Sequence, residues 1–78
     1  MLTIEKLRKH AGLKQTQLAR LCRPPLSVQT IRRIEHGEPT TYETVQRALT
    51  VLNEHLGTAH RIEDISGVTL KRGNLMSD

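Results

Sequence analysis

The hydrophobic positions of this chain recur mostly at helical spacing. Ile4, Leu7 and Ala11 lie three and four residues apart, which places their side chains on one face of a helix. Thr3 stands just before this run, where its hydroxyl can accept a hydrogen bond from the first turn, and Gly12 stands just after it. The pattern predicts a first helix between Thr3 and Gly12.

A second, shorter helix is predicted from Gln15 to Leu21. Leu18, Ala19 and Leu21 form its apolar side. Two consecutive prolines follow, and proline lacks a backbone N–H and disfavours the helical conformation in the residue before it. The second helix therefore ends by Cys22.

A third helix is predicted over residues 28–36. Ser27 can cap its first turn, and Gly37 and Pro39 stop it. Two short helices joined by a tight non-helical turn form a helix-turn-helix. The second helix of this motif can enter the major groove of DNA.

A fourth, longer helix is predicted in the second half of the chain. Thr40 and Glu43 have the spacing of a capping box at its start, and Gly57 closes it. Its apolar stripe consists of Val45, Ala48, Leu49, Leu52 and Leu56.

The end of the chain is less regular. Residues 61–67 predict one more short helical turn, with Ile62 and Ile65 facing inward. Val68 and Leu70 then alternate as in a strand, and the last six residues look like a frayed tail.

The length and the helical pattern together define one domain. The chain has 78 residues, one tyrosine and neither phenylalanine nor tryptophan, so its core is aliphatic and a deep active-site cavity is not expected. We expect an all-helical small bundle over residues 1–66. Residues 67–78 would be a C-terminal extension that forms a strand, a dimer arm or a disordered tail.

The outward face of the third helix carries a distinctive set of side chains. Successive helical residues turn by about 100°, so relative to Ile31 the outward direction lies at about 150°. Gln29 lies at about 160°, between Arg32 at about 100° and Arg33 at about 200°, with a valine and a threonine at the edges. Arginine, glutamine and small apolar groups are the side chains that recognise guanine, adenine and the thymine methyl at base edges.

Charge is distributed unevenly along the chain, whose net charge is +4. From Lys6 to Arg33 the sequence has eight lysines or arginines and no acid, while from Ile34 to Leu70 it has six acids and two arginines. A basic first half favours binding to a polyanion. The alternative is that these cations are ordinary solvated side chains on exposed helix faces and bind no partner.

The sequence also resembles a known family. The segments "LKQTQLARLC", "LSVQTIRRIEHG" and "PTTYETVQRAL" are similar to the helix-turn-helix and following helix of the phage repressor and Cro family, also called the Xre or lambda-repressor-like family. The resemblance extends over residues 2–65. It implies a five-helix bundle that binds operator DNA, with a palindromic double-stranded operator and a homodimer on it.

The resemblance further implies roles for individual residues. The family's base-reading positions carry Val28, Gln29, Arg32 and Arg33, of which Arg32 reads either a base or a phosphate. Its phosphate-contacting positions carry Lys14, Gln15, Ser27, Thr30 and His36. Arg8 stands where the family has an arginine paired with the glutamate that matches Glu35, and the semi-buried helical angle of Glu35 agrees with such a structural ion pair.

Two features depart from the family pattern. The segment "RPPL" replaces the usual glycine of the turn and lengthens it, which bears on the angle of the recognition helix, residues 28–36. Glu38 stands where a basic residue is common, and an acid near phosphates weakens binding unless it is turned away.

Enzymatic chemistry is not predicted. His55 and His60 lack zinc-ligand spacing, and no catalytic, metal or cofactor site is expected. Cys22 is the single cysteine, which fits a reducing compartment. We interpret it as a half-buried structural residue rather than a thiol activated by Arg23.

The sequence has no apolar run of the ~18 residues that a membrane span needs, and its start lacks the apolar core of a signal peptide. We therefore expect a soluble cytoplasmic protein, bacterial or phage-encoded, without a membrane partner.

The main alternative to a transcriptional repressor is a protein-binding function. Small members of the family include antitoxins, which bind a toxin protein as well as their own operator, and residues 67–78 would be the place for that contact. RNA is disfavoured because single-stranded RNA is usually held by stacked aromatics, and Tyr42 is the single aromatic residue.

Overall fold

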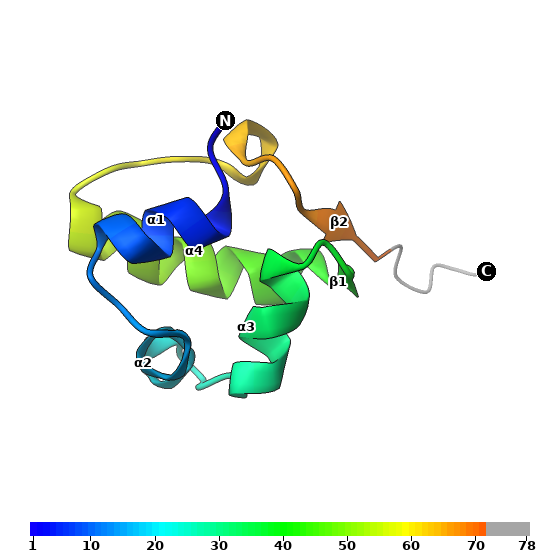
Figure 1. Cartoon of the computed structure of the whole chain (residues 1–78), viewed down its shortest axis with the longest axis horizontal. Helices are drawn as coiled ribbons and strands as arrows, with labels where there is room; N and C mark the ends of the chain where they lie inside the picture. The colour runs from blue at the N-terminus through cyan, green and yellow to red at the C-terminus, as the bar shows by residue number, and fades with distance from the viewer. Residues whose placement is uncertain (72–78) are drawn as a thin grey trace.

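The computed structural model describes residues 1–71, and its helices begin and end close to the predicted positions (Figure 1). The helices are α1 (Ile4–His10), α2 (Gln15–Leu21), α3 (Val28–Glu35) and α4 (Tyr42–Leu56). The other elements are a 3-10 turn, η1 (Ile62–Asp64), and the strands β1 (Pro39–Thr40) and β2 (Thr69–Leu70). The predicted frayed tail, the last six residues, lies outside the described part of the chain.

The predicted bundle of five helices is confirmed as mostly helical but corrected in its last elements. Four α-helices lie within residues 1–71, and the fifth expected helix is the single 3-10 turn η1. Ile62 and Ile65 are buried as predicted, yet Ile65 is already extended, with φ −100° and ψ 128°. One turn suffices to bury both isoleucines, and the extended chain after it leads to β2, which pairs with β1.

Side-chain caps fix the starts of the first and third helices. Thr3 Oγ1 accepts a hydrogen bond from the Lys6 N–H at 3.1 Å, and Ser27 Oγ accepts one from the Thr30 N–H at 3.2 Å. Each cap satisfies a backbone donor that has no partner within its helix. The predictions of both caps are confirmed. The third helix ends one residue earlier than predicted, with His36 as its C-cap.

The start of α4 corrects a prediction. The capping residue is Thr41, whose hydroxyl accepts from the Thr44 N–H at 3.3 Å, and not Thr40. Thr40 is buried, belongs to β1, and donates its hydroxyl hydrogen to the Glu38 carbonyl at 2.9 Å. Neighbouring threonines have the same capping ability, so the pairing of β1 decided which one caps.

The core is aliphatic: α1 and α2 pack against α4, which runs lengthwise through the molecule, and α3 packs against α1 and α2 (Figure 1). Its most deeply buried side chains include Leu18, Ile31, Leu49 and Leu52. Leu21, predicted on the apolar side of α2, is instead 41% exposed. Leu18 and Ala19 are the residues of this helix that are buried, and Leu21 lies at a pocket between the end of α2 and α4.

Cys22 corrects the prediction of a half-buried thiol, because it is 1% exposed. Its thiol donates a hydrogen bond to the Leu18 carbonyl at 3.3 Å. Burial raises the pKa of the Cys22 thiol, and the nearby charge of Arg47 opposes this only in part. The thiol is therefore protonated and structural, and Arg23 does not activate it.

The segment after η1 returns to the third helix. β2 pairs with β1 in parallel, with Thr69 opposite Pro39 and Leu70 opposite Thr40. The backbone segments just before the two strands approach closely: a Cβ on Gly37 would lie 3.3 Å from the Gly67 carbonyl oxygen, and Gly37 has φ 78°. Glycine is the residue that accepts both the contact and the positive φ. The pairing places residues 67–71 beside the end of α3.

Candidate nucleic-acid interface

The third helix has one buried and one exposed side, as its sequence predicts. Ile31 and Ile34 are 0% and 2% exposed and anchor α3 in the core. Gln29, Arg32 and Arg33 are exposed on the opposite side. Burial of the two isoleucines thus fixes the rotation of α3, so that a glutamine and two arginines face outward.

An ion pair joins α3 to α1. Arg8 Nε donates to Glu35 Oε2 at 2.6 Å, and Arg8 Nη2 donates to Glu35 Oε1 at 3.3 Å. The side chains of Arg8 and Glu35 are 12% and 4% exposed. Arg8 Nη1 also donates to the Leu13 carbonyl at 3.0 Å, so the buried guanidinium has partners on two sides. This contact sets the position of α3 relative to the first helix.

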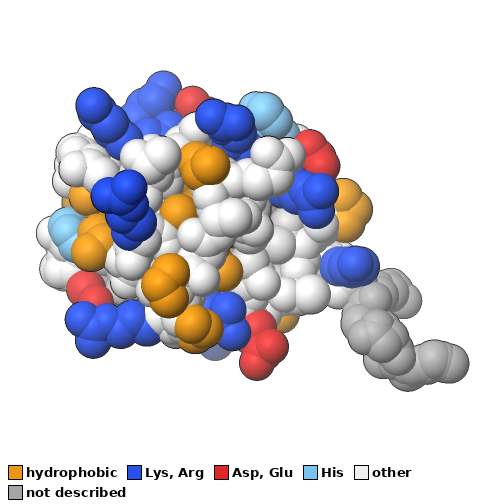
Figure 2. Space-filling view, turned by 90° about the horizontal axis from the view of Figure 1, so that it is seen from below, with side chains coloured by type: hydrophobic (Ala, Val, Ile, Leu, Met, Phe, Trp, Pro, Cys, Tyr) orange, Lys and Arg blue, Asp and Glu red, His pale blue; other side chains and the backbone are white. Residues whose placement is uncertain are grey.

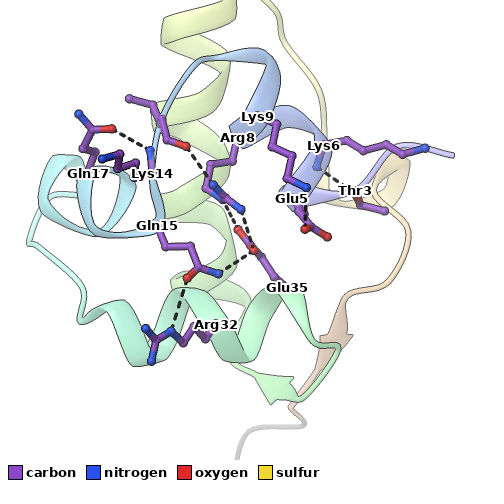
Figure 3. A network of polar contacts seen from close by, with 11 residues as sticks. Thr3, Glu5, Lys6, Arg8, Lys9, Lys14, Gln15, Gln17, Arg32 and Glu35 are labelled. Carbon is purple, nitrogen blue, oxygen red and sulfur yellow. Dashed lines mark hydrogen bonds and ion pairs between the residues drawn. The ribbon is translucent and has the colours of Figure 1, made fainter.

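Gln15 extends the ion pair into a network of four side chains (Figure 3). Its Nε2 donates to Glu35 Oε1 at 2.9 Å, and its Oε1 accepts from Arg32 Nε at 3.4 Å. The first residue of α2 thereby connects the buried carboxylate with an exposed arginine of α3. The sequence carries no signal for this bridge, because its partners are 20 and 17 residues away along the chain.

The side chains of Arg32 and Arg33 extend from α3 toward different neighbouring elements. Arg32 lies toward α2, where Gln15 holds it. Arg33 lies on the flank of β1 and the start of α4, where it lines a pocket together with Thr30 and Thr44. Gln29 stands between these flanks at the first half of the helix. Three polar side chains are thereby spread across the outward face of α3.

The remaining predicted contact residues surround this face. Lys14 is exposed directly before α2, and His36 is exposed directly after α3. Ser27 and Thr30 share a hydrogen bond between their hydroxyls at 3.0 Å at the start of α3. Val28 is half-buried at the margin of the helix.

Figure 2 shows the side of the molecule on which α2 and the start of α3 lie in Figure 1. Lysine and arginine side chains are spread over this side, and acidic side chains lie toward its outline. A larger pocket of about 440 Å³ lies between the end of α2 and α4. It contains no residue of α3, so it is not part of this surface.

Comparison with known proteins identifies the family. A family model described as a helix-turn-helix matches residues 4–58, and the chain therefore belongs to the Xre/lambda-repressor-like helix-turn-helix family. It is a DNA-binding transcription regulator of a family that is typically non-enzymatic. Comparison with the curated proteins and with the solved structures gave no match.

In residues 1–71, no helix has the length and apolar character to cross a membrane. Within the same range, no three histidine, cysteine, aspartate or glutamate side chains gather as a metal site would require.

Proposed function

We propose that this protein is a sequence-specific repressor that inserts the recognition helix, residues 28–36, into the major groove of double-stranded DNA. The observation that carries the proposal is the exposed set of Gln29, Arg32 and Arg33 on a helix anchored by its buried isoleucines. A rigid helix with such a face can hold donors and acceptors in register with base edges.

Base recognition is assigned to four residues of α3. Gln29 would pair with adenine and Arg33 with guanine, each through two hydrogen bonds, and Val28 would contact a thymine methyl. Arg32 would reach a base or a phosphate on the α2 side, where its bond to Gln15 at 3.4 Å is long and easily exchanged for a contact with DNA.

Backbone contacts are assigned to the residues around α3. These residues are Lys14, Gln15, Ser27, Thr30 and His36. They surround the outward face, so their charges and hydrogen-bond donors would set the depth and direction of the helix without selecting a sequence.

A dimer on a palindromic operator is part of the proposal. One helix of eight residues reaches only a few base pairs, and two copies related by a two-fold axis double the recognised length. The half-sites would then lie about one helical turn apart, roughly 34 Å. Occupation of such an operator represses by excluding other proteins from the DNA.

Selection of bound sequences from random duplex DNA tests the proposal. The expected product is a palindrome with two half-sites about one turn apart. Enrichment of a sequence without symmetry would contradict the dimer, and absence of any enriched sequence would contradict specific recognition.

The antitoxin function remains a second candidate because of one observation. Leu70, in the segment 67–78, is 43% exposed although it is apolar, which offers a contact for a protein partner. Residues 72–78 of that segment lie outside the described residues. A toxin-like reading frame next to the gene would support this candidate, and co-purification of the two products would test it.

A further inference from the structure

A small cationic pocket lies beside the third helix and includes a residue from the far end of the chain. Its volume is about 190 Å³. It is lined by Thr30 and Arg33 of α3, Thr41 and Thr44 at the start of α4, strand β1, and Lys71. The lining contains two cations and no carboxylate.

The pairing of the two strands brings Lys71 to this pocket. The Lys71 N–H donates to the Thr40 carbonyl at 2.8 Å, which continues the parallel pairing of β2 with β1. A further backbone bond, from the Ser66 N–H to the Leu2 carbonyl at 2.7 Å, fixes the chain before β2. Backbone hydrogen bonds therefore hold Lys71 in place next to β1, in the same pocket as Arg33.

The charges of the pocket are not balanced by the protein. In residues 1–71, neither Arg33 nor Lys71 forms an ion pair with a carboxylate. Two cations that share a pocket repel each other, and a bound anion converts this repulsion into attraction. The pocket therefore favours an anionic ligand.

The threonines supply hydrogen-bond donors for such an anion. Thr41 and Thr44 share a hydrogen bond between their hydroxyls at 2.8 Å, and Thr30 shares one with Ser27 at 3.0 Å. Each pair of hydroxyls has two hydrogens and uses one of them in the shared bond. One hydrogen of the Thr41–Thr44 pair is thus free to donate to a ligand oxygen in the pocket, and Thr30 supplies a second when Ser27 is the donor of their shared bond.

We propose that this pocket binds a phosphate of the DNA backbone and that Lys71 is its principal cation. This inference rests on the proposed function, in which Arg33 of the same pocket turns toward a base. Lysine and threonine side chains are common phosphate partners, and contacts of this kind position a protein without reading sequence. Lys71 supplies the charge at the phosphate while the guanidinium of Arg33 is engaged in the groove.

The test compares Lys71→Ala with Arg61→Ala, which makes the same change in net charge. Arg61 immediately precedes η1, and η1 lies at the opposite side of the molecule from α2 (Figure 1). Each variant is titrated with the operator and with an unrelated duplex at several salt concentrations. One lost phosphate contact lowers the slope of log affinity against log salt by about 0.9, which is about a fivefold loss of affinity at 0.15 M salt.

We expect Lys71→Ala to show this loss equally on both duplexes, with the preferred sequence unchanged, and Lys71→Arg to restore most of it. A neutral methylphosphonate is then placed at each operator phosphate in turn. At one position per half-site it should weaken the parent protein but leave Lys71→Ala unchanged. These results would establish that Lys71 contacts a DNA phosphate and would identify that phosphate in each half-site.

Three outcomes overturn the inference. The first is that Lys71→Ala equals Arg61→Ala in affinity and salt slope, and the second is that Lys71→Ala alters the preferred sequence. The third is that inorganic phosphate alone saturates the pocket, as followed by the amide resonances of Thr41 and Thr44, while the Lys71→Ala substitution leaves DNA binding unchanged. The pocket would then bind a free anion. Equal binding of all duplexes by the parent protein would instead refute specific recognition, and the Lys71 comparison would still be decisive.

Discussion

Arg8 of α1 and Glu35 of α3 are joined by two hydrogen bonds, at 2.6 Å and 3.3 Å, although they lie 27 residues apart. Glu35 is the more deeply buried partner, with a side chain only 4% exposed, and it also accepts a hydrogen bond from Gln15. The same carboxylate therefore holds the first helix, the start of the second and the recognition helix together. Its removal should affect both stability and DNA binding.

Glu35→Ala should lower the free energy of unfolding by about 3–5 kcal/mol, because it leaves the buried charge of Arg8 without its partner. Urea denaturation measures the change. Glu5→Ala is the matched control, since Glu5 forms an exposed pair with Lys9 at 3.1 Å and should cost less than about 1 kcal/mol. Equal effects of the two variants would mean that the buried pair contributes no more than a surface pair.

Arg33→Ala should relax the preference at one base pair of each half-site, and Gln29→Ala at a neighbouring pair. A good bidentate contact contributes roughly 1–3 kcal/mol of discrimination, so each loss is visible in a selection from random duplexes. The lengthened turn between α2 and α3 makes Arg32→Ala an informative third variant, because a tilted helix would exchange the roles of the two arginines. If all three variants weakened binding to every sequence evenly, α3 would contact the DNA phosphate backbone and not the base edges.

Gln15→Ala should weaken binding to all duplexes by a similar factor, because Gln15 is assigned a backbone contact that carries no sequence information. The loss of its bonds to Glu35 and Arg32 adds to this effect without introducing sequence preference. Gln46→Ala on α4 is a suitable control, since Gln46 bonds Thr50 and lines the pocket remote from α3. A changed consensus for Gln15→Ala would show that Gln15 takes part in recognition of bases.

Cys22 should make the protein less stable at alkaline pH. Burial raises the pKa of its thiol in the folded state above the ordinary value of 9.0. Above that ordinary value the unfolded chain releases the thiol proton while the folded chain retains it, so stability is lost as pH rises through the folded pKa. Thermal unfolding between pH 7 and pH 10 should show a decline in the parent protein that is smaller in Cys22→Ala. A parallel decline in both proteins would assign the effect to other groups.

Local signals in the sequence determined the helices of this protein. Thr3 and Ser27 cap the helices that follow them, and two prolines end α2, because these effects act within one helical turn. The rotation of α3 was also predictable, since Ile31 and Ile34 must face the core and the opposite side must face solvent. The family follows from the same local pattern, and the match over residues 4–58 confirms it.

Long-range packing decided what local pattern left open. The choice of Thr41 over Thr40 as the cap, and the exposure of Leu21, depend on which neighbours fill the adjacent space. The bridge from Glu35 through Gln15 to Arg32 requires α2 and α3 to cross at one particular distance. The position of Lys71 in the same pocket as Arg33 depends on backbone pairing between β1 and β2. Each strand has only two residues, so the side-chain pattern of the sequence does not indicate which strand pairs with which. Hydrogen bonds between distant segments form only after the core has set the helices in position, so the tertiary structure alone determined them.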